Sequence, residues 1–507
     1  MTDSSGTSGA AEPVETGAAQ LIGLDVGTSS CKGGLFDARG RLLALASAPY
    51  PVERPQPGHV EQDAEAYWSG AVRCIRQLLA APQARPARLA ALSSCGQAPT
   101  MVLLDGAGSP LRPAILWQDT RAAAEAEQLA REPGTDTLAQ WIGVRWPPDA
   151  SLPLARLLWL RHHEPQVVAR LRTVLLPKDF VHFRLTGRVA SDAWSAKGLV
   201  HQATRRPVAA LRDLAGIDLA AIPPASDAHE VIGHVSPAGA AATGLPAGLP
   251  VAAGWTDAMA AMLGTGALDR AGLACDVSGT SEVVGLTVPA RPTETGPLLT
   301  APVATSERWQ LYGPTQASGG SLGWALRAIG GDLDLDRALA AAAAVPAGSG
   351  GLLFLPYLEG ERAPLWDPRA RGAYVGLSSS HETAHLIRAV LEGVACSVRH
   401  ILSTAETLAG MRAAEVRVAG GGARLALWNQ IKADVCARPM RPCATSENGV
   451  LGAAMLAALG AGLYADVSAA GEAMVHLHEP ILPQAAHRET YDRLFERYVG
   501  LYPRLKP

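Results

Sequence analysis

A short motif that occurs twice, half a chain apart, constrains the fold of this protein more than any other feature. Asp25-Val26-Gly27-Thr28-Ser29 returns as Asp276-Val277-Ser278-Gly279-Thr280-Ser281, with one inserted residue. The two aspartates are 251 positions apart in a chain of 507 residues, which is too long for one compact core. The repeat therefore predicts a duplicated domain, with a boundary or hinge at residues 264–267.

The first copy lies in a strand-turn-strand unit. Residues 21–26 form an apolar strand, residues 27–30 a turn, and residues 33–36 the next strand. A Rossmann nucleotide-binding unit would begin strand-turn-helix instead. Helical stretches then alternate with short apolar strands, at residues 41–46, 89–93, 101–104, 174–176 and 251–253. This alternation predicts an α/β fold.

The second half contains one clearly amphipathic helix. Ser379 and Glu382 have capping-box spacing, and apolar residues then recur every four positions, at Leu386, Val390, Val394 and Val398. The helix is expected to end at residues 409–410 and to pack on a sheet. A strand at residues 415–419 and a helix at residues 424–435 are predicted on either side of a glycine run.

Composition excludes several kinds of partner and location. The chain has 44 basic and 47 acidic residues, so a nucleic-acid partner is not expected. No apolar run reaches membrane-span length, and residues 1–18 predict a disordered tail rather than a signal peptide. The seven cysteines show no metal-ligand spacing, which predicts reduced, mostly buried thiols in a cytoplasmic protein.

The repeated turn has a chemistry of its own. Glycine lets backbone N–H groups approach a phosphate closely, Thr28 and Ser29 add hydroxyl donors, and Lys32 adds positive charge. Asp25, at the end of a strand, can hold Mg²⁺ directly or through water. A single copy is more simply a β-turn, whereas two copies favour two loops facing one nucleotide. Neither a P-loop nor the motif set of protein kinases is present.

Three other segments carry candidate chemistry, each with a plainer alternative. Gly420-Gly421-Gly422-Ala423 lies between a strand and a helix, where it permits close approach of an adenosine or simply makes a tight turn. Asp257 follows the strand at residues 250–253 and is a candidate base for a kinase, or the cap of the next helix. Asp119 and Arg121 pair an acceptor with a donor, which alone indicates an ordinary helix start.

These segments together resemble the FGGY family of carbohydrate kinases, and xylulokinases most of all, from about residue 20 to about residue 505. The resemblance is carried by residues 23–29, 61–63, 112–121, 175–179, 185–187, 254–257, 278–281, 354–364 and 420–423. It implies two actin-like ATPase (ribonuclease-H-like) domains with an interdomain catalytic cleft. The sugar-binding domain is expected at residues 19–266 and the ATP-binding domain at residues 267–507.

The resemblance also implies roles for single residues. Asp257 matches the catalytic base, and Asp25 with Asp257 the magnesium site. The expected ATP-binding residues are Thr28, Ser29, Lys32, Gly279, Thr280, Gly319, Gly320, Gly421, Gly422 and Ala423. The expected substrate-binding residues are Gln97, Ala98, Pro99, Asp119, Arg121 and Asp257.

Two departures from the xylulokinase pattern lie in the substrate half. The chain has Gln97-Ala98-Pro99-Thr100 where xylulokinases usually carry Gln-Met-His-Gly, and Ala258 where they usually carry Asn. Losing a polar partner of the substrate can change preference greatly. The resemblance therefore supports a kinase of a small polyhydroxy compound more strongly than a xylulokinase.

The predicted activity is ATP-dependent phosphorylation of a hydroxyl of a small sugar or polyol, with D-xylulose or a related ketose or alditol as substrate. ATP and Mg²⁺ are the expected cofactors, and a homodimer is common in the resembling family. One alternative is a sugar-binding regulator with little catalysis. The other is an actin-like or chaperone-like ATPase that acts on a protein partner.

Overall fold

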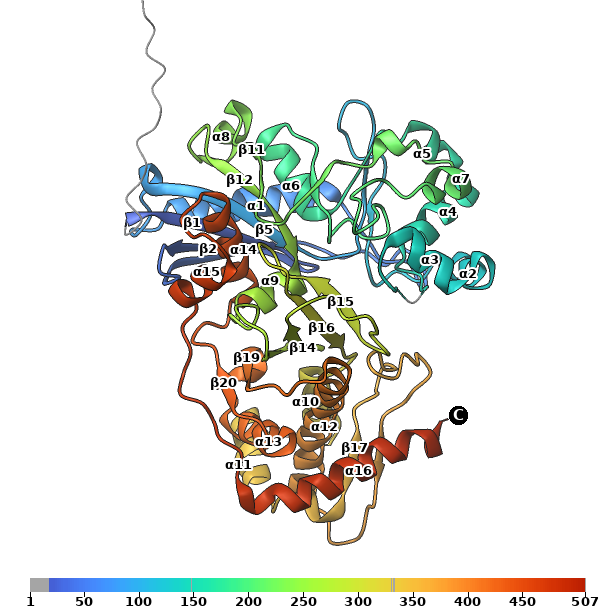
Figure 1. Ribbon diagram of the computed structural model, residues 1–507, viewed down its shortest axis with the longest axis vertical. Helices are drawn as coiled ribbons and strands as arrows, with labels where there is room; N and C mark the ends of the chain where they lie inside the picture. Colours follow the sequence, from blue (N-terminus) through green and yellow to red (C-terminus); the bar gives the residue numbers. More distant parts are fainter. Residues whose placement is uncertain (1–17, 147, 330, 332, 507) are drawn as a thin grey trace, which may run out of the picture.

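A computed structural model describes residues 18–146, 148–329, 331 and 333–506. The predicted tail at residues 1–18 lies outside these ranges, apart from its last residue. Two α/β bodies lie one above the other in Figure 1, each built on a mixed six-stranded sheet, which confirms the predicted fold class.

The first sheet has the order β11-β12-β5-β1-β2-β3. Its strands are β1 (Gln20–Val26), β2 (Ser30–Asp37), β3 (Leu42–Pro49), β5 (Leu89–Gly96), β11 (Val231–His234) and β12 (Pro250–Thr256). They include most of the predicted strands of this half, while residues 101–104 and 174–176 meet in a separate two-stranded sheet of β6 (Val102–Leu104) and β8 (Thr173–Leu175). The helices of this half are α1 (Ala64–Leu79), α2 (Ala123–Leu129), α3 (Thr135–Ile142), α4 (Pro153–His163), α5 (Pro165–Arg170), α6 (Pro177–Thr186), α7 (Ala210–Ala215), α8 (Pro237–Thr243) and α9 (Asp257–Leu263).

The second sheet repeats this plan with the order β15-β16-β14-β13-β19-β20. Its strands are β13 (Leu273–Ser278), β14 (Glu282–Val288), β15 (Leu299–Pro302), β16 (Trp309–Pro314), β19 (Glu415–Gly420) and β20 (Met440–Pro442). In both sheets the central strand, β1 or β13, pairs antiparallel with the next strand and parallel with β5 or β19. Asp25 and Asp276 lie near the carboxyl ends of these two central strands, so the repeated motif marks a structural duplication.

The long amphipathic helix of the second half is confirmed as α12 (Thr383–Ala409). Its predicted capping box is wrong, because the N-cap is Glu382 itself and not Ser379. The Glu382 N–H donates to His385 Nδ1 at 3.2 Å. The other helices of this body are α10 (Gly319–Ala328), α11 (Leu335–Ala344), α13 (Ala426–Cys436) and α16 (Arg488–Leu505).

One helix of the second half packs on the first sheet. α14 (Asn448–Gly460) and the following α15 (Val467–Met474), in red, lie beside β1 and β2, in blue, in Figure 1. α14 is apolar on all sides and buried against β1, β5, β12 and α9. The contact is close because glycines meet backbone: a Cβ atom on Gly23 would lie 2.1 Å from Val450 O, and one on Gly452 would lie 1.9 Å from Ala260 O. The domain limits at residues 266 and 267 stay a prediction.

All seven cysteines are buried and free of disulfides, as predicted. Within the described ranges, no helix combines the length and apolarity that crossing a membrane requires.

Candidate active site

Asp257 stands where β12 ends and α9 begins. The N-cap of α9 is Thr256, whose Oγ1 accepts from the Met259 N–H at 3.4 Å, so the capping alternative for Asp257 is wrong. Within the described ranges, the one hydrogen bond of Asp257 Oδ1 is local, from the Ala258 N–H at 2.7 Å. The carboxylate is therefore positioned by the first helical turn while its other oxygen stays available for chemistry.

The surroundings of Asp257 suit a proton acceptor. Desolvation by the surrounding protein raises its pKa to about 6, although its side chain still reaches solvent. The Ala258 N–H and the charges of Lys197 and Arg362 act in the opposite direction. A carboxylate with this pKa is mostly ionised at neutral pH and is a stronger base than an ordinary aspartate.

Asp25 provides a second carboxylate that acts on the first. Burial and, next, the charge of Asp257 raise the pKa of Asp25 to about 7, against the effects of Lys32 and Cys95. Asp25 Oδ1 is buried without a hydrogen-bond partner among the described residues. An unpaired carboxylate oxygen beside another carboxylate is the donor set that Mg²⁺ takes when it also binds substrate phosphates. The residues present therefore fit this ion.

The corresponding aspartate of the second sheet is used differently. Asp276 Oδ2 lies 2.6 Å from the ammonium of Lys432, which also pairs with Glu282 and donates to Ser278 Oγ at 2.9 Å. All four side chains are buried. The ammonium of Lys432 thus neutralises the carboxylate of Asp276 in the second copy of the motif. In the first copy, Asp25 keeps an oxygen without a partner among the described residues.

The predicted ATP-binding residues of the second half converge on the turn at residues 278–281. The Gly319 N–H donates to Gly279 O at 3.1 Å, and the Gly320 N–H donates to Thr280 O at 3.0 Å. The start of α10 is thereby fixed over this turn. Gly279 and Thr280 remain exposed.

The glycine run after β19 packs against the same turn. Gly420 has φ +79°, and a Cβ atom there would lie 2.3 Å from Ser278 O. A Cβ atom on Gly422 would lie 2.8 Å from Ser278 Cβ, whereas one on Gly421 would meet nothing within 4 Å. Close packing against Ser278 requires glycine at positions 420 and 422. No atom in the part of the chain that the structure describes requires glycine at position 421, so a bound ligand is the remaining reason for Gly421. Ala423 O is occupied, since it accepts from Asn429 Nδ2 at 2.7 Å.

Gln97 joins the first glycine turn to the predicted substrate segments. Its Nε2 donates to Gly27 O at 3.2 Å, and its Oε1 accepts from Thr100 Oγ1 at 3.2 Å. Thr28 Oγ1 contacts Gln97 Oε1 at 3.4 Å and accepts from Trp117 Nε1 at 3.0 Å. Thr28 therefore faces the substrate half in this structure. Ser29 is exposed in the turn, and Ala98 and Pro99 follow Gln97 as half-buried residues.

Asp119 and Arg121 form a buried pair. Asp119 Oδ2 accepts from the Val60 N–H at 2.6 Å and from Arg121 Nη2 at 2.7 Å, while Oδ1 accepts from Arg121 Nε at 2.8 Å. Burial favours a higher pKa for Asp119, but these bonds outweigh it and lower the pKa. Arg121 also pairs with Glu61 at 2.7 Å. The pair orders this segment, and direct contact with substrate stays a prediction.

Arg156, in α4, is a buried residue that the sequence patterns did not indicate. It donates to Pro99 O at 2.7 Å, to Leu116 O at 2.6 Å and to Ala150 O at 3.0 Å. Burial lowers its pKa to about 10. One arginine thereby ties three segments around the predicted substrate site. Its position inside an apolar helical run offers no motif by which to find it.

Lys197 is the second residue that sequence reasoning missed. Its Nζ lies 5.0 Å from the ring centre of Trp146 and 5.0 Å from that of Trp194. Burial lowers its pKa to about 8, against the charges of Asp192 and Asp257. Trp194 is three positions from Lys197, but Trp146 comes from a distant segment, so only the fold reveals the cage.

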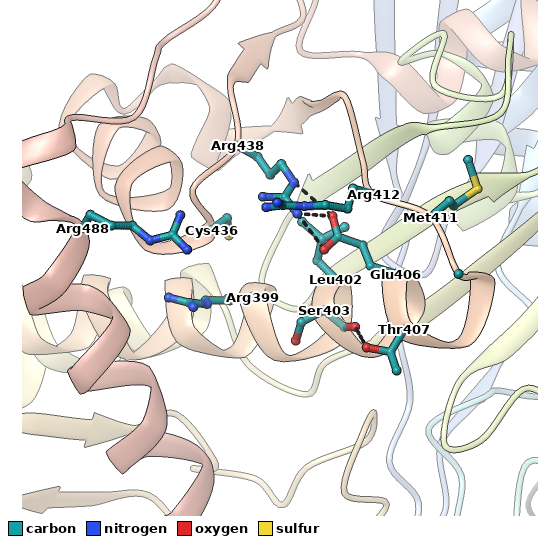
Figure 2. A pocket seen from close by; sticks show the side chains of 11 residues that line it. Arg399, Leu402, Ser403, Glu406, Thr407, Met411, Arg412, Cys436, Arg438 and Arg488 are labelled. Atoms are coloured by element: carbon teal, nitrogen blue, oxygen red, sulfur yellow. Dashed lines mark hydrogen bonds and ion pairs between the residues drawn. The ribbon is translucent and has the colours of Figure 1, made fainter.

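A pocket of about 400 Å³ lies elsewhere, between α12, α13 and α16 (Figure 2). Arg438 pairs with Glu406 at 2.6 Å, and Arg399 and Arg488 share Asp492 at 2.7 and 2.6 Å. None of the predicted site residues lines this pocket. The pocket is therefore separate from the predicted site.

Comparisons with known proteins agree with this geometry. Models of the FGGY family of carbohydrate kinases match residues 20–264 (N-terminal domain) and 275–461 (C-terminal domain). The chain is 32% identical to xylulose kinase of Lactococcus lactis over 487 residues, 95% of this chain and 96% of that protein. It is 29% identical to the L-xylulose/3-keto-L-gulonate kinase of Escherichia coli over 496 residues, 96% of this chain and 97% of that protein.

A solved structure shows the same architecture over nearly the whole chain. The xylulose kinase of Rhodospirillum rubrum superposes with a TM-score of 0.85 at 32% identity, covering 96% of this chain and 99% of that one. The family models, the sequence identities and the superposed structure thus agree over nearly the whole chain. The chain belongs to the FGGY family of carbohydrate kinases.

Proposed function

We propose that this kinase transfers the γ-phosphoryl group of ATP to a hydroxyl of a small sugar or polyol, with Asp257 as the base. The observation that carries the proposal is the position of Asp257. It lies at the strand–helix junction with one oxygen uncommitted, and it acts electrostatically on a second carboxylate with an unpaired oxygen, Asp25.

The chemistry of the transfer requires little from the protein beyond positioning and charge. Asp257 accepts the proton of the substrate hydroxyl, whose oxygen forms the new bond to phosphorus while the bond to the departing ADP breaks. Arg362 and Lys197 keep Asp257 ionised at neutral pH. Removing the carboxylate is expected to slow the reaction roughly 10²–10⁴-fold.

Asp25, together with Asp257, would hold Mg²⁺. The ion would neutralise negative charge on the phosphates of ATP. Ser29 and Lys32 would approach these phosphates from the first turn, together with the backbone of Thr28, whose hydroxyl is engaged with Gln97 and Trp117. Gly279 and Thr280 would approach them from the second turn. Gly421 would lie closest to the adenosine.

The substrate is proposed from two sources. Relatives named for xylulose point to a ketopentose such as D-xylulose. One relative is named for both L-xylulose and a keto sugar acid, so the candidates extend to acidic sugars. The predicted sugar-binding domain has no side-chain hydrogen-bonding groups at Ala98, Pro99 and Ala258. This difference from the xylulokinase pattern favours an acceptor other than D-xylulose. A cytoplasmic location and a homodimer stay predictions.

A coupled assay of ADP release tests the proposal, with ketopentoses, ketohexoses, alditols and sugar acids as acceptors. We expect turnover with at least one acceptor and its loss in Asp257→Ala, which should still bind ATP. Tight ATP binding with no acceptor-dependent turnover would instead support a sugar-binding regulator. ATP hydrolysis that no acceptor stimulates would support an ATPase that acts on a protein.

A further inference from the structure

The cage around Lys197 holds a cation whose charge acts on the proposed base, Asp257. The segment that carries Lys197 is tied to β12, because Lys178 pairs with Asp192 at 2.9 Å and donates to Ala253 O at 2.9 Å. Trp146 and Trp194 each present a ring to the ammonium at 5.0 Å, and two such contacts replace much of its hydration. The fold therefore holds a positive charge in one place without surrounding it by carboxylates.

Among the residues that the structure describes, none forms an ion pair or hydrogen bond with the Lys197 ammonium. Asp192 acts on Lys197, but its own oxygens are engaged. Oδ2 lies 2.9 Å from the ammonium of Lys178, and Oδ1 accepts from the Ser195 N–H at 2.8 Å. The acid whose charge acts most strongly on Lys197 thus belongs to another ion pair, and the N–H donors of Lys197 remain available to a ligand.

The neighbouring segments offer few other donors to a substrate. Ala98, Pro99 and Ala258 have no polar side-chain atoms. Arg156 binds both Pro99 O and Ala150 O, so the segment that follows Trp146 lies against the predicted substrate segment. Besides Lys197, Arg362 also acts on Asp257. Arg362 is engaged, since its guanidinium donates to Thr315 O. Of these two cations, Lys197 is therefore the one whose N–H donors have no acceptor among the described residues.

We propose that the acceptor of this kinase is a polyhydroxy acid, and that Lys197, held between Trp146 and Trp194, binds its carboxylate. The inference rests on the proposed function and narrows its substrate class. A carboxylate at Lys197 forms a charge-assisted hydrogen bond that a neutral alcohol cannot match. The hydroxyl to be phosphorylated then lies at the other side of the substrate, at Asp257.

The test compares acid and alcohol acceptors with the same carbon chain: D-gluconate with D-glucitol, and D-xylonate with xylitol, with D-xylulose added. We expect kcat/KM for an acid to exceed that for its alcohol by roughly 10²-fold. Lys197→Met should lower kcat/KM for the acid by roughly 10²-fold and leave the KM for ATP nearly unchanged. Its effect on the alcohol reaction should be much smaller and should disappear at alkaline pH, because there the variant loses only a charge that helps to ionise Asp257. Lys197→Arg, which keeps the charge, should recover part of the loss.

Lys506→Met is the matched control, because the Lys506 side chain is half-exposed directly after α16, where it pairs with Asp367 at 3.3 Å. It should behave as the unaltered protein. Melting temperatures of all variants separate lost recognition from lost folding, and Lys197→Arg gives a second reading if Lys197→Met is unstable.

Two results would overturn the inference and leave the proposed function intact. One is Asp257-dependent phosphorylation of neutral acceptors with no reaction of acids. The other is a Lys197→Met effect of equal size on acids, alcohols and the KM for ATP, which would assign Lys197 to the phosphates. If no acceptor increases ADP release and Asp257→Ala changes nothing, the proposed function fails and the inference falls with it.

Discussion

Lys32 Nζ lies 3.2 Å from Glu447 Oε2, although the two residues are 415 positions apart. Glu447 is the N-cap residue of α14, and Lys32 is on β2, directly opposite Asp25. One of the proposed phosphate ligands is therefore held by an acid from the other half of the chain. The phosphates of ATP must compete with this acid.

Substitutions at this pair should change ATP affinity in opposite directions. Lys32→Met should raise the KM for ATP about tenfold by removing a phosphate partner. Glu447→Gln should lower it about two- to fivefold, because the Lys32 side chain is 45% exposed and such a pair is weak. Steady-state kinetics at low and high salt measure both effects, which should shrink with salt. An equal rise of KM in both variants would contradict this role of Lys32.

Activity should fall in acid as Asp257 takes up a proton. Because a base works only when deprotonated and the pKa of Asp257 is raised to about 6, kcat/KM at saturating Mg²⁺ should fall below about pH 6. At limiting Mg²⁺ the decline should begin nearer pH 7, because Asp25 must lose its own proton before it binds the ion. A pH–rate profile that is flat down to pH 5 would exclude Asp257 as the base.

Asp25 and Asp276 should differ in their effect on metal dependence. Asp25→Asn should weaken the apparent affinity for Mg²⁺ by at least about tenfold. Asp276→Asn removes a partner of buried Lys432 and should instead lower stability by roughly 3–5 kcal/mol. Magnesium titrations of activity and urea unfolding measure the two effects. If Asp276→Asn alters the Mg²⁺ requirement as strongly as Asp25→Asn, the different roles assigned to the two aspartates are wrong.

Substitutions at the glycines after β19 should distinguish a position that contacts ATP from a position that is needed for packing. Gly421→Ala meets no protein atom, so it should leave the melting temperature unchanged and raise the KM for ATP several-fold. Gly420→Ala imposes a side chain at φ +79° and 2.3 Å from Ser278 O, and it should destabilise the protein by at least about 1 kcal/mol. A Gly421→Ala variant with normal ATP kinetics would place the adenosine elsewhere.

The attachment of α14 depends on glycine at its contact with α9. Gly452→Ala would bring a methyl group to 1.9 Å from Ala260 O, and we expect a loss of at least about 3 kcal/mol of stability. Gly500→Ala is the matched control. It lies in α16 with nothing within 4 Å and should stabilise the protein by about 0.5–1 kcal/mol. Urea unfolding of both variants gives the comparison, and equal stabilities would contradict the close contact.

Local patterns were enough to predict the fold class and several strands, because apolar strands and glycine turns are encoded within a few residues. The duplication was visible because both copies kept the turn beside Asp25 and Asp276. Asp257 could be found from its place after a strand and from family resemblance. These features depend on neighbours in sequence.

Features that depend on distant packing could not be predicted. The pattern of α14 shows a helix buried on all sides but not which sheet it covers. The N-cap of α12 is Glu382, three residues after the predicted Ser379, because the spacing of Ser379 and Glu382 alone does not show at which of them the helix begins. The Lys197 cage joins Trp146 and Trp194 across the chain, and Lys432 neutralises Asp276 from another helix. Tertiary contacts decide all of these.

The placement of α14 has a consequence for how the protein is made. A ribosome delivers the first sheet long before it delivers residues 448–460, yet that helix covers one face of the sheet. In the nascent first half, apolar strands therefore remain exposed until nearly the whole chain has left the ribosome. Chaperones commonly bind chains in this state. We therefore expect either half to aggregate when it is synthesised alone, and the two halves to fold as one unit.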